Sequence, residues 1–179
     1  MRKLPLAMIA TVLVAAQADE KVDNPEYKGW VGQAAGAWVK FNTEVETGGV
    51  KKEFVTTTKL NEISSERALI DQAEEIDVNG MKVVNHGIRS LAAKIRKGTD
   101  SDGLKVEPKS KGVQELEIKG TKLKCPWVEE KVTGKDDLMT VRTWRHDTIV
   151  GGIAKIVFKI EKPEKKTITR TATDWKAAE

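Results

Sequence analysis

The feature that most constrains the fold of this chain is a period-two alternation of side chains in short runs. In one run every second residue is apolar or threonine, namely Val39, Phe41, Thr43 and Val45. Polar residues stand between them. Successive side chains of a strand point to opposite faces, so such a run predicts a strand with one buried face. Helical periodicity is almost absent after residue 18.

Glycine-containing pairs separate these runs, as in Gly48-Gly49, Asn79-Gly80 and Gly151-Gly152. Asn79-Gly80 is the strongest turn signal, because both residues tolerate a positive φ. Short strands joined by tight turns pair in an antiparallel manner. The sequence therefore predicts a mainly β fold, an antiparallel meander of about nine strands that forms a curved sheet, a half-barrel or a small barrel. A sandwich of two sheets is the competing layout.

The expected strands are unevenly distributed along the chain. They cover residues 39–46, 54–60, 68–78, 81–84, 116–118, 123–127, 138–144, 153–160 and 167–175. Between Asn85 and Gly112 the alternation loosens. Residues 90–95 fit either one helical turn or a short strand, while Gly98–Gly103 and Pro108–Gly112 have the composition of loops.

The N-terminus has the pattern of a secretory signal. Arg2 and Lys3 precede a thirteen-residue apolar run, and Ala16-Gln17-Ala18 supplies the small residues of a cleavage site. Thirteen residues are too few to span a bilayer, which needs roughly 20. We expect a signal peptide over 1–18, an irregular or short helical lead over 19–36 and a single β domain over 37–179. The protein would be periplasmic or secreted, and would meet the membrane only through its signal during export.

The composition of the mature chain excludes some partners. Removal of the first 18 of 179 residues leaves 161, with 29 basic and 27 acidic side chains and a formal net charge of +2. The charges are interleaved, whereas nucleic-acid binding requires a concentrated basic face. We therefore expect no nucleic-acid partner. Cys125 is the only cysteine and is expected to be a small buried residue rather than a reactive thiol.

Candidate catalytic and metal sites are weak. His86 and His146 are sixty residues apart, with no second ligand type at metal spacing. Asp100-Ser101-Asp102-Gly103 lacks a third oxygen ligand before its glycine, so it predicts an ordinary turn rather than a calcium loop. Glu74-Glu75 and Glu129-Glu130 are neighbours on strands and point to opposite faces. We expect no catalytic residues, no metal, no cofactor and no enzymatic activity.

Tryptophan is frequent for a chain that has a single tyrosine. The five residues are Trp30, Trp38, Trp127, Trp144 and Trp175. Packing in the core and at sheet edges is one interpretation. The other is an aromatic groove for a lipid tail or a sugar, for which Trp38, Trp127 and Trp144 are the candidate ligand-binding residues.

Several residues carry a resemblance to known proteins. They are the lead Asn24-Pro25-Glu26-Tyr27-Lys28-Gly29-Trp30 with Gly36-x-Trp38-Val39, then Gly120 with Leu123-x-Cys125, Trp144, and Val150-Gly151-Gly152-Ile153. In these the chain resembles a group of small exported bacterial proteins of unknown function. Its strand pattern alone also resembles the periplasmic lipoprotein-carrier type of half-barrel, an antiparallel sheet around an apolar groove.

Two functions follow as hypotheses. The first is an exported, non-enzymatic binding module that holds a lipid or another apolar ligand against the concave sheet. The second is a structural or protein-interaction component of the cell envelope, which binds another envelope protein through a sheet edge or the tryptophans. An enclosed apolar cavity favours the first hypothesis, and an exposed apolar patch favours the second.

Overall fold

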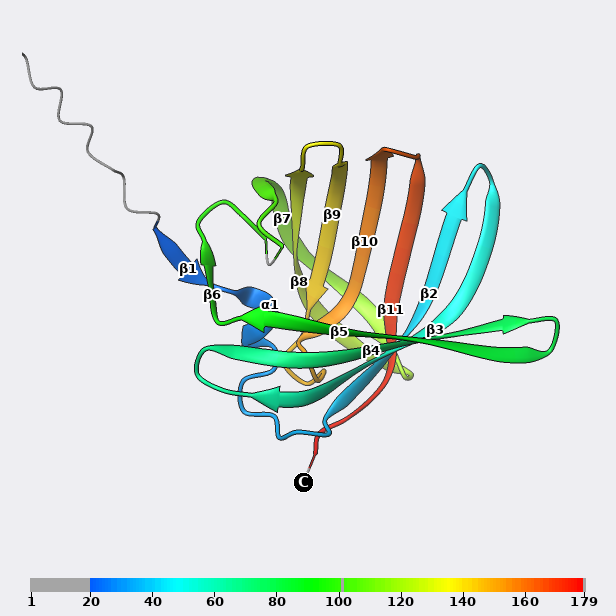
Figure 1. Cartoon of the computed structure of the whole chain (residues 1–179), viewed down its shortest axis with the longest axis horizontal. Coiled ribbons are helices and arrows are strands. Elements are labelled where there is room, and N and C mark those ends of the chain that lie inside the picture. The colour runs from blue at the N-terminus through cyan, green and yellow to red at the C-terminus, as the bar shows by residue number, and fades with distance from the viewer. Residues whose placement is uncertain (1–19, 101, 179) are drawn as a thin grey trace, which may run out of the picture.

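A computed structural model describes residues 20–100 and 102–178, so the expected signal peptide lies outside the described residues. The fold is a nine-stranded antiparallel sheet with a small two-stranded sheet beside it (Figure 1). The large sheet contains β2 (Trp38–Thr47), β3 (Val50–Ile63), β4 (Arg67–Val78), β5 (Met81–Ala92), β7 (Lys105–Ile118), β8 (Thr121–Thr133), β9 (Leu138–Arg145), β10 (Ile153–Lys162) and β11 (Lys166–Lys176). The small sheet pairs β1 (Lys21–Asp23) with β6 (Lys94–Arg96), and α1 (Pro25–Lys28) is a single helical turn.

The strand order is β5-β4-β3-β2-β11-β10-β9-β8-β7. The predicted antiparallel sheet of about nine strands is confirmed, and the structure divides the meander into two. One runs outward from β2 to the edge strand β5, and the other runs inward from the edge strand β7 to β11. The two meet where β2 pairs with β11. The sheet is open, since β5 and β7 are its two ends.

The open sheet is strongly curved. Figure 1 shows β8, β9, β10 and β11 standing upright while β4 and β5 cross in front of them. Each meander needs only short turns, and Asn79-Gly80 makes one of them with φ values of 55° and 81°. Positive φ at both central residues is the geometry of a type I′ hairpin, so this predicted turn is confirmed.

Alternating residues of the central strands form the core, as predicted. On β2 the buried members are Val39, Phe41 and Thr43, and on β3 they are Thr56, Thr58 and Leu60. Thr43 and Thr56 satisfy each other's hydroxyls through a buried hydrogen bond of 2.9 Å between their Oγ1 atoms. The polar positions between the core residues are intermediate or exposed.

The lead segment is fastened onto the sheet. Asn24 is buried, accepts a hydrogen bond from the Glu26 amide and donates one to the Ala92 carbonyl at 2.8 Å. The Tyr27 hydroxyl donates to the Ser64 carbonyl at 2.6 Å, and Trp30 is buried. Tyr27 and Trp30 therefore dock the lead onto the sheet, and strand β1 in this segment was not predicted.

The prediction of one loop is wrong. Pro108–Gly112 was expected to be a loop, but it lies inside β7. The ladder with β8 shifts register between Pro108 and Ser110. Proline cannot donate to a sheet ladder, but it is tolerated on an edge strand or at a bulge. Pro108 lies on the edge strand β7 and also at a bulge, so the strand continues through it.

The far end of the β7–β8 hairpin packs on the end of β11. Lys119 lies in the turn of this hairpin and donates a hydrogen bond to Asp174 at 2.6 Å. Its ammonium lies 5.0 Å from the centroid of the Trp175 ring. Ile118 and Cys125 are buried in the same cluster as Ala154 and Ala172. Within the described residues no helix is long and apolar enough to cross a membrane.

Candidate ligand cavity

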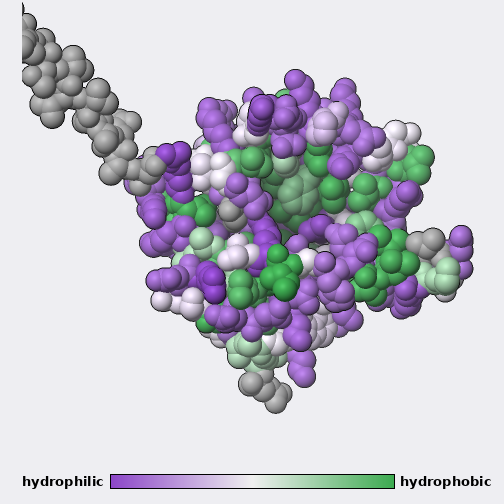
Figure 2. Space-filling view, in the orientation of Figure 1, coloured by the Kyte–Doolittle hydropathy of each residue, from purple (hydrophilic) through white to green (hydrophobic). Residues whose placement is uncertain are grey.

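A cavity of about 350 Å³ lies on the concave side of the sheet. Its lining comes from every strand from β4 to β11 in chain order, together with α1 and the loop that precedes β7. Figure 2 shows a hollow with hydrophobic residues at its floor and hydrophilic residues around its rim. A smaller space of about 90 Å³ adjoins it and shares Arg89, Ile156, Phe158 and Arg170 with it.

The floor of the cavity is apolar because of the alternation in β9 and β10. Ile156 and Phe158 of β10 point into it. Val141 of β9 pairs with Phe158, and Met139 lies two residues from Val141 on the same strand. Val132 of β8 extends the same surface. The smaller space continues it toward β2 and β4 through Val39, Phe41 and Ile70.

Arg170 is a charged residue at the centre of this surface. It lies on β11, the middle strand of the nine, directly across from Ile156. Its side chain is 25% exposed, and the nearest ion-pair partner is Glu74, at 3.7 Å from Nη2. Its Nε atom is buried and has no hydrogen-bond partner among the described residues. Burial lowers the pKa of the Arg170 guanidinium, and Glu74 opposes this shift.

A second arginine and a carboxyl group lie at the other side of the cavity. Arg145, at the end of β9, donates a hydrogen bond to the Pro25 carbonyl at 3.3 Å. Burial lowers its pKa, while Glu26 and Glu130 act in the opposite direction. Glu130 of β8 has its pKa raised by burial, and Arg145 opposes this shift. The Arg145 charge is thus offset by nearby carboxylates.

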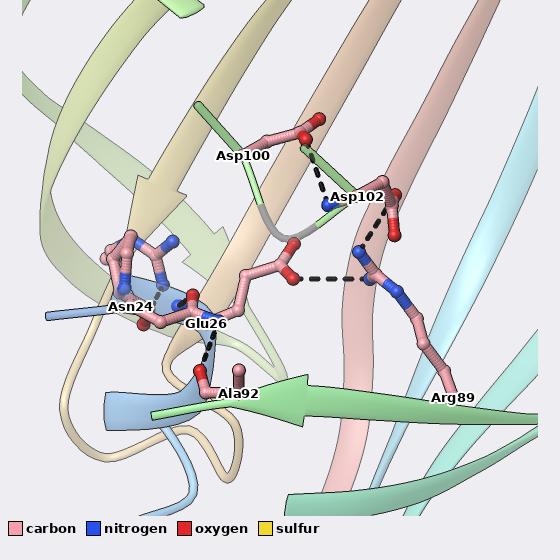
Figure 3. Close-up of polar contacts among 8 residues, drawn as sticks. Asn24, Glu26, Arg89, Ala92, Asp100 and Asp102 are labelled. Atoms are coloured by element: carbon pink, nitrogen blue, oxygen red, sulfur yellow. Dashed lines mark hydrogen bonds and ion pairs between the residues drawn. The ribbon is translucent and has the colours of Figure 1, made fainter. Parts of the chain in front are cut away.

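Arg89 closes the rim. It forms ion pairs of 3.2 Å with Glu26 of α1 and with Asp102 of the loop that precedes β7 (Figure 3). Asp100 shapes that loop, because its carboxylate accepts hydrogen bonds from the Asp102 and Leu104 amides at 2.9 Å. The arrangement connects β5, α1 and the loop at one end of the cavity.

The three tryptophans predicted as ligand-binding residues lie on the opposite face of the sheet. Trp144 stands between the cavity residues Thr143 and Arg145, so its ring points away from the cavity. Trp127 is its cross-strand partner on β8 and shares its face. Trp38 precedes the cavity residue Val39 and also points away.

On that opposite face, Trp127 and Trp144 form one group with Arg142. The Arg142 guanidinium lies 4.6 Å from the centroid of Trp127 and 5.7 Å from that of Trp144. It also pairs with Glu129 at 2.5 Å. A smaller hollow of about 200 Å³ lies there, lined by Arg142 and Trp144 among others. Trp127 covers Gly112, where a Cβ would meet the indole at 2.8 Å.

The other sequence candidates are far apart. His86 lies 3.4 Å from Asp71 on an exposed surface, and His146 contacts Thr148 in the loop between β9 and β10. Among the described residues no group of three or more potential metal ligands is gathered. Cys125 is free and buried, as expected, and burial raises the pKa of its thiol.

The sequence interpretation missed the charged residues of the cavity, although the alternation marks them. Arg170 stands in phase with the inward residues Ile168 and Ala172, and Glu130 stands in phase with Val132. A charged residue at an apolar position of a strand is a buried charge, which requires a partner or a purpose. That signal was available before the structure.

Comparisons with known proteins give limited similarity. No protein-family model and no curated protein matches the chain. Among solved structures, a Bacteroides fragilis protein described as exported and as having a YmcC-like fold aligns with 9% identity and a TM-score of 0.45, covering 80% of this chain and 97% of its own. A DUF1329 family protein from Desulfovibrio piger aligns with 8% identity and a TM-score of 0.31, covering 86% and 93%. Function is therefore argued from the residues of this chain.

Proposed function

We propose that the protein is an exported, non-enzymatic binding module that holds an apolar or amphiphilic ligand in its concave cavity. The observation that carries the proposal is the cavity itself, whose apolar floor is formed by residues such as Ile156, Phe158 and Val141. Ligand sites are typically concave and mostly apolar, with a few convergent polar groups, and occupy roughly 300–1,000 Å³. A volume of about 350 Å³ falls at the lower end of that range.

The construction of the sheet supports this role. The residues of the cavity floor come from regular strands in a fixed register, so backbone pairing fixes the shape of the floor. The rim contact of Arg89 with Glu26 and Asp102 fixes one end. An expected signal at residues 1–18 fits a carrier or binding role outside the cytoplasm.

A fluorescence titration tests the proposal. N-phenyl-1-naphthylamine is an uncharged apolar probe whose emission rises when it leaves water. We expect saturable binding to the wild-type protein, and loss of binding when Ile156→Trp fills the cavity. Lys159→Trp is the matched control, because Lys159 lies on the same strand, on the other face and exposed to solvent.

The two variants distinguish binding in the cavity from binding on the opposite face. Binding that survives Ile156→Trp but is lost with Lys159→Trp would place the ligand on the opposite face, near Trp144. An absence of binding to the wild-type protein would refute the carriage of an apolar ligand. Circular dichroism and thermal melts of each variant check that the sheet is retained.

A second candidate function is a protein-interaction component of the cell envelope, and one observation favours it. The edge strand β5 exposes four large hydrophobic side chains: Met81, Val83, Val84 and Ile88. An edge strand also presents unpaired backbone groups, to which another strand can add. Protein partners of this kind would be recognised by β-augmentation along β5.

Site-specific photo-crosslinking in the native envelope tests the second candidate. A photo-reactive residue at position 88 should form one discrete adduct if β5 is an interface, whereas the same residue at position 161, an exposed site on β10, should not. The absence of an adduct at position 88 would remove this candidate and leave the cavity proposal unaffected.

A further inference from the structure

The polar groups of the cavity differ in how well their charges are balanced. Arg89 has two carboxylates at 3.2 Å, from Glu26 and Asp102. Arg145 is offset by Glu26 and Glu130. Arg170 has Glu74 alone as an ion-pair partner among residues 20–100 and 102–178, at the longer distance of 3.7 Å. Arg170 is therefore more weakly ion-paired than Arg89, with one carboxylate at a longer distance instead of two.

The hydrogen-bonding state of Arg170 supports the same conclusion. A guanidinium has five N–H donors, and a buried donor without an acceptor costs free energy. Nε of Arg170 is such a donor, buried and without an acceptor among the described residues. The donors that a ligand in the cavity can reach are therefore the terminal nitrogens of this guanidinium, whose side chain is 25% exposed and lines the cavity.

The surroundings of Arg170 restrict the shape of the ligand that could supply the acceptor. Ile156 lies directly across from Arg170, and Phe158 is two residues farther along β10. Val141 and Met139 continue the apolar surface on β9. A ligand whose charged end meets Arg170 therefore has room for an apolar chain in one direction along the floor.

The acidic side of the cavity fixes the orientation. Glu130 lies on β8, three strands from β11, which corresponds to about 14 Å at the usual strand spacing. At that side, repulsion of a negatively charged group by Glu130 and Asp100 opposes its attraction to Arg145. At the other side of the cavity the negatively charged group is attracted to Arg170.

We propose that the ligand is an anionic amphiphile of the fatty-acid class, with its carboxylate on Arg170 and its chain along Ile156 and Phe158. This inference rests on the proposed function, and adds the charge and orientation of the ligand to it. Arginine pairs with a carboxylate through two parallel N–H donors, so the carboxylate would lie on the terminal nitrogens of Arg170.

Competition experiments test the inference. Dodecanoate, dodecanol and dodecyltrimethylammonium have the same chain length and differ in charge. Each amphiphile is titrated against bound N-phenyl-1-naphthylamine, at concentrations below the critical micelle concentration of that amphiphile. Hydrogen bonds to a charged partner correspond to about ten- to hundredfold in affinity, so we expect dodecanoate to bind at least about tenfold more tightly than dodecanol, and the cation most weakly.

Arg170→Met removes the charge and retains an unbranched apolar side chain between the inward residues Ile168 and Ala172. It should abolish the preference for dodecanoate and leave dodecanol binding within about twofold. Arg170→Gln is the second variant with the same expectation. Arg142→Gln is the matched control, because Arg142 lies on the opposite face over Trp127, and it should retain the full preference.

Each outcome has one meaning. Equal affinities of the wild-type protein for dodecanoate and dodecanol would overturn the assignment of an anionic ligand while leaving the binding function intact. A preference that persists in Arg170→Met would overturn the role of Arg170. If none of the amphiphiles and no neutral probe binds, the proposed function itself fails. The comparison in the wild-type protein decides the question even if both Arg170 variants fail to fold.

Discussion

Trp30 and Gly151 lie in direct contact at the junction between the lead segment and the sheet. A Cβ atom on Gly151 would stand 3.0 Å from Cζ2 of the Trp30 ring, and Gly151 has a φ of 77°. The neighbouring Gly29 is closer still, since its Cβ position is 2.1 Å from the Gly151 carbonyl oxygen. The lead segment thus packs against the loop between β9 and β10 through Gly29, Gly151 and the Trp30 indole.

Gly29→Ala should destabilise the protein through this contact. Because a methyl group cannot stand 2.1 Å from a carbonyl oxygen, the lead or the β9–β10 loop must move, at a cost of about 2 kcal/mol or more. Gly87→Ala is the control, since nothing lies within 4 Å of its Cβ position. Urea melts of the two variants check the prediction, and equal midpoints would contradict it.

The turn between β4 and β5 supports a second prediction. Gly80 has a φ of 81°, and its amide donates to the Asp77 carboxylate at 2.8 Å. Gly80→Val should cost at least about 1 kcal/mol, because a β-branched residue is strained at positive φ. Gly80→Asn should cost less, since asparagine tolerates that region. Thermal melts of both variants would refute the turn assignment if Gly80→Val left the melting temperature unchanged.

The local structure was largely readable from the alternation. Val39, Phe41 and Thr43 are buried as predicted, and Asn79-Gly80 makes the predicted hairpin. These features depend on neighbours in sequence. The order of the strands does not depend on neighbours in sequence. The pairing of β2 with β11 joins residues such as Phe41 and Ala172, which no local pattern connects.

The candidate site was harder to predict for a related reason. The alternation assigns Trp144 to one face and Thr143 to the other, but it does not say which face is concave. Trp127 and Trp144 were chosen for their aromatic rings, and the structure places both on the face away from the cavity. The alternation places Arg170 in phase with Ile168 and Ala172, but only its pairing with Ile156 shows that this face of β11 lines the cavity.

Asp23 provides a prediction about pH. The ammonium groups of Lys28 and Lys94 hold the pKa of its carboxyl at about 2, from an ordinary value of 3.8. Since the pKa is lowered in the folded state, the favourable interaction is fully present above pH 3.8 and is lost as the pH falls through about 2. Carbon-detected NMR of the Asp23 carboxyl should show a midpoint near 2, and Lys94→Met should raise it. A wild-type midpoint near 3.8 would show that the pair is absent in solution.

Phe158 and Lys159 test the two faces of β10. Phe158 lines the cavity and is only half-buried, whereas Lys159 is exposed on the other face. Truncation of a fully packed phenylalanine costs about 3–5 kcal/mol, through lost burial and a new void. Phe158 already borders open space, so we expect Phe158→Ala to cost less than this and to weaken the binding of an apolar probe.

Lys159→Ala should change the stability by no more than about 0.5 kcal/mol and leave probe binding unchanged. Denaturant melts combined with titration of N-phenyl-1-naphthylamine measure both quantities on both variants. A loss of about 3–5 kcal/mol for Phe158→Ala with unaltered probe binding would mean that the ring is packed core rather than cavity wall. Equal destabilisation by the two substitutions would contradict the alternation in β10, on which the orientation of Ile156 and the placement of the ligand both depend.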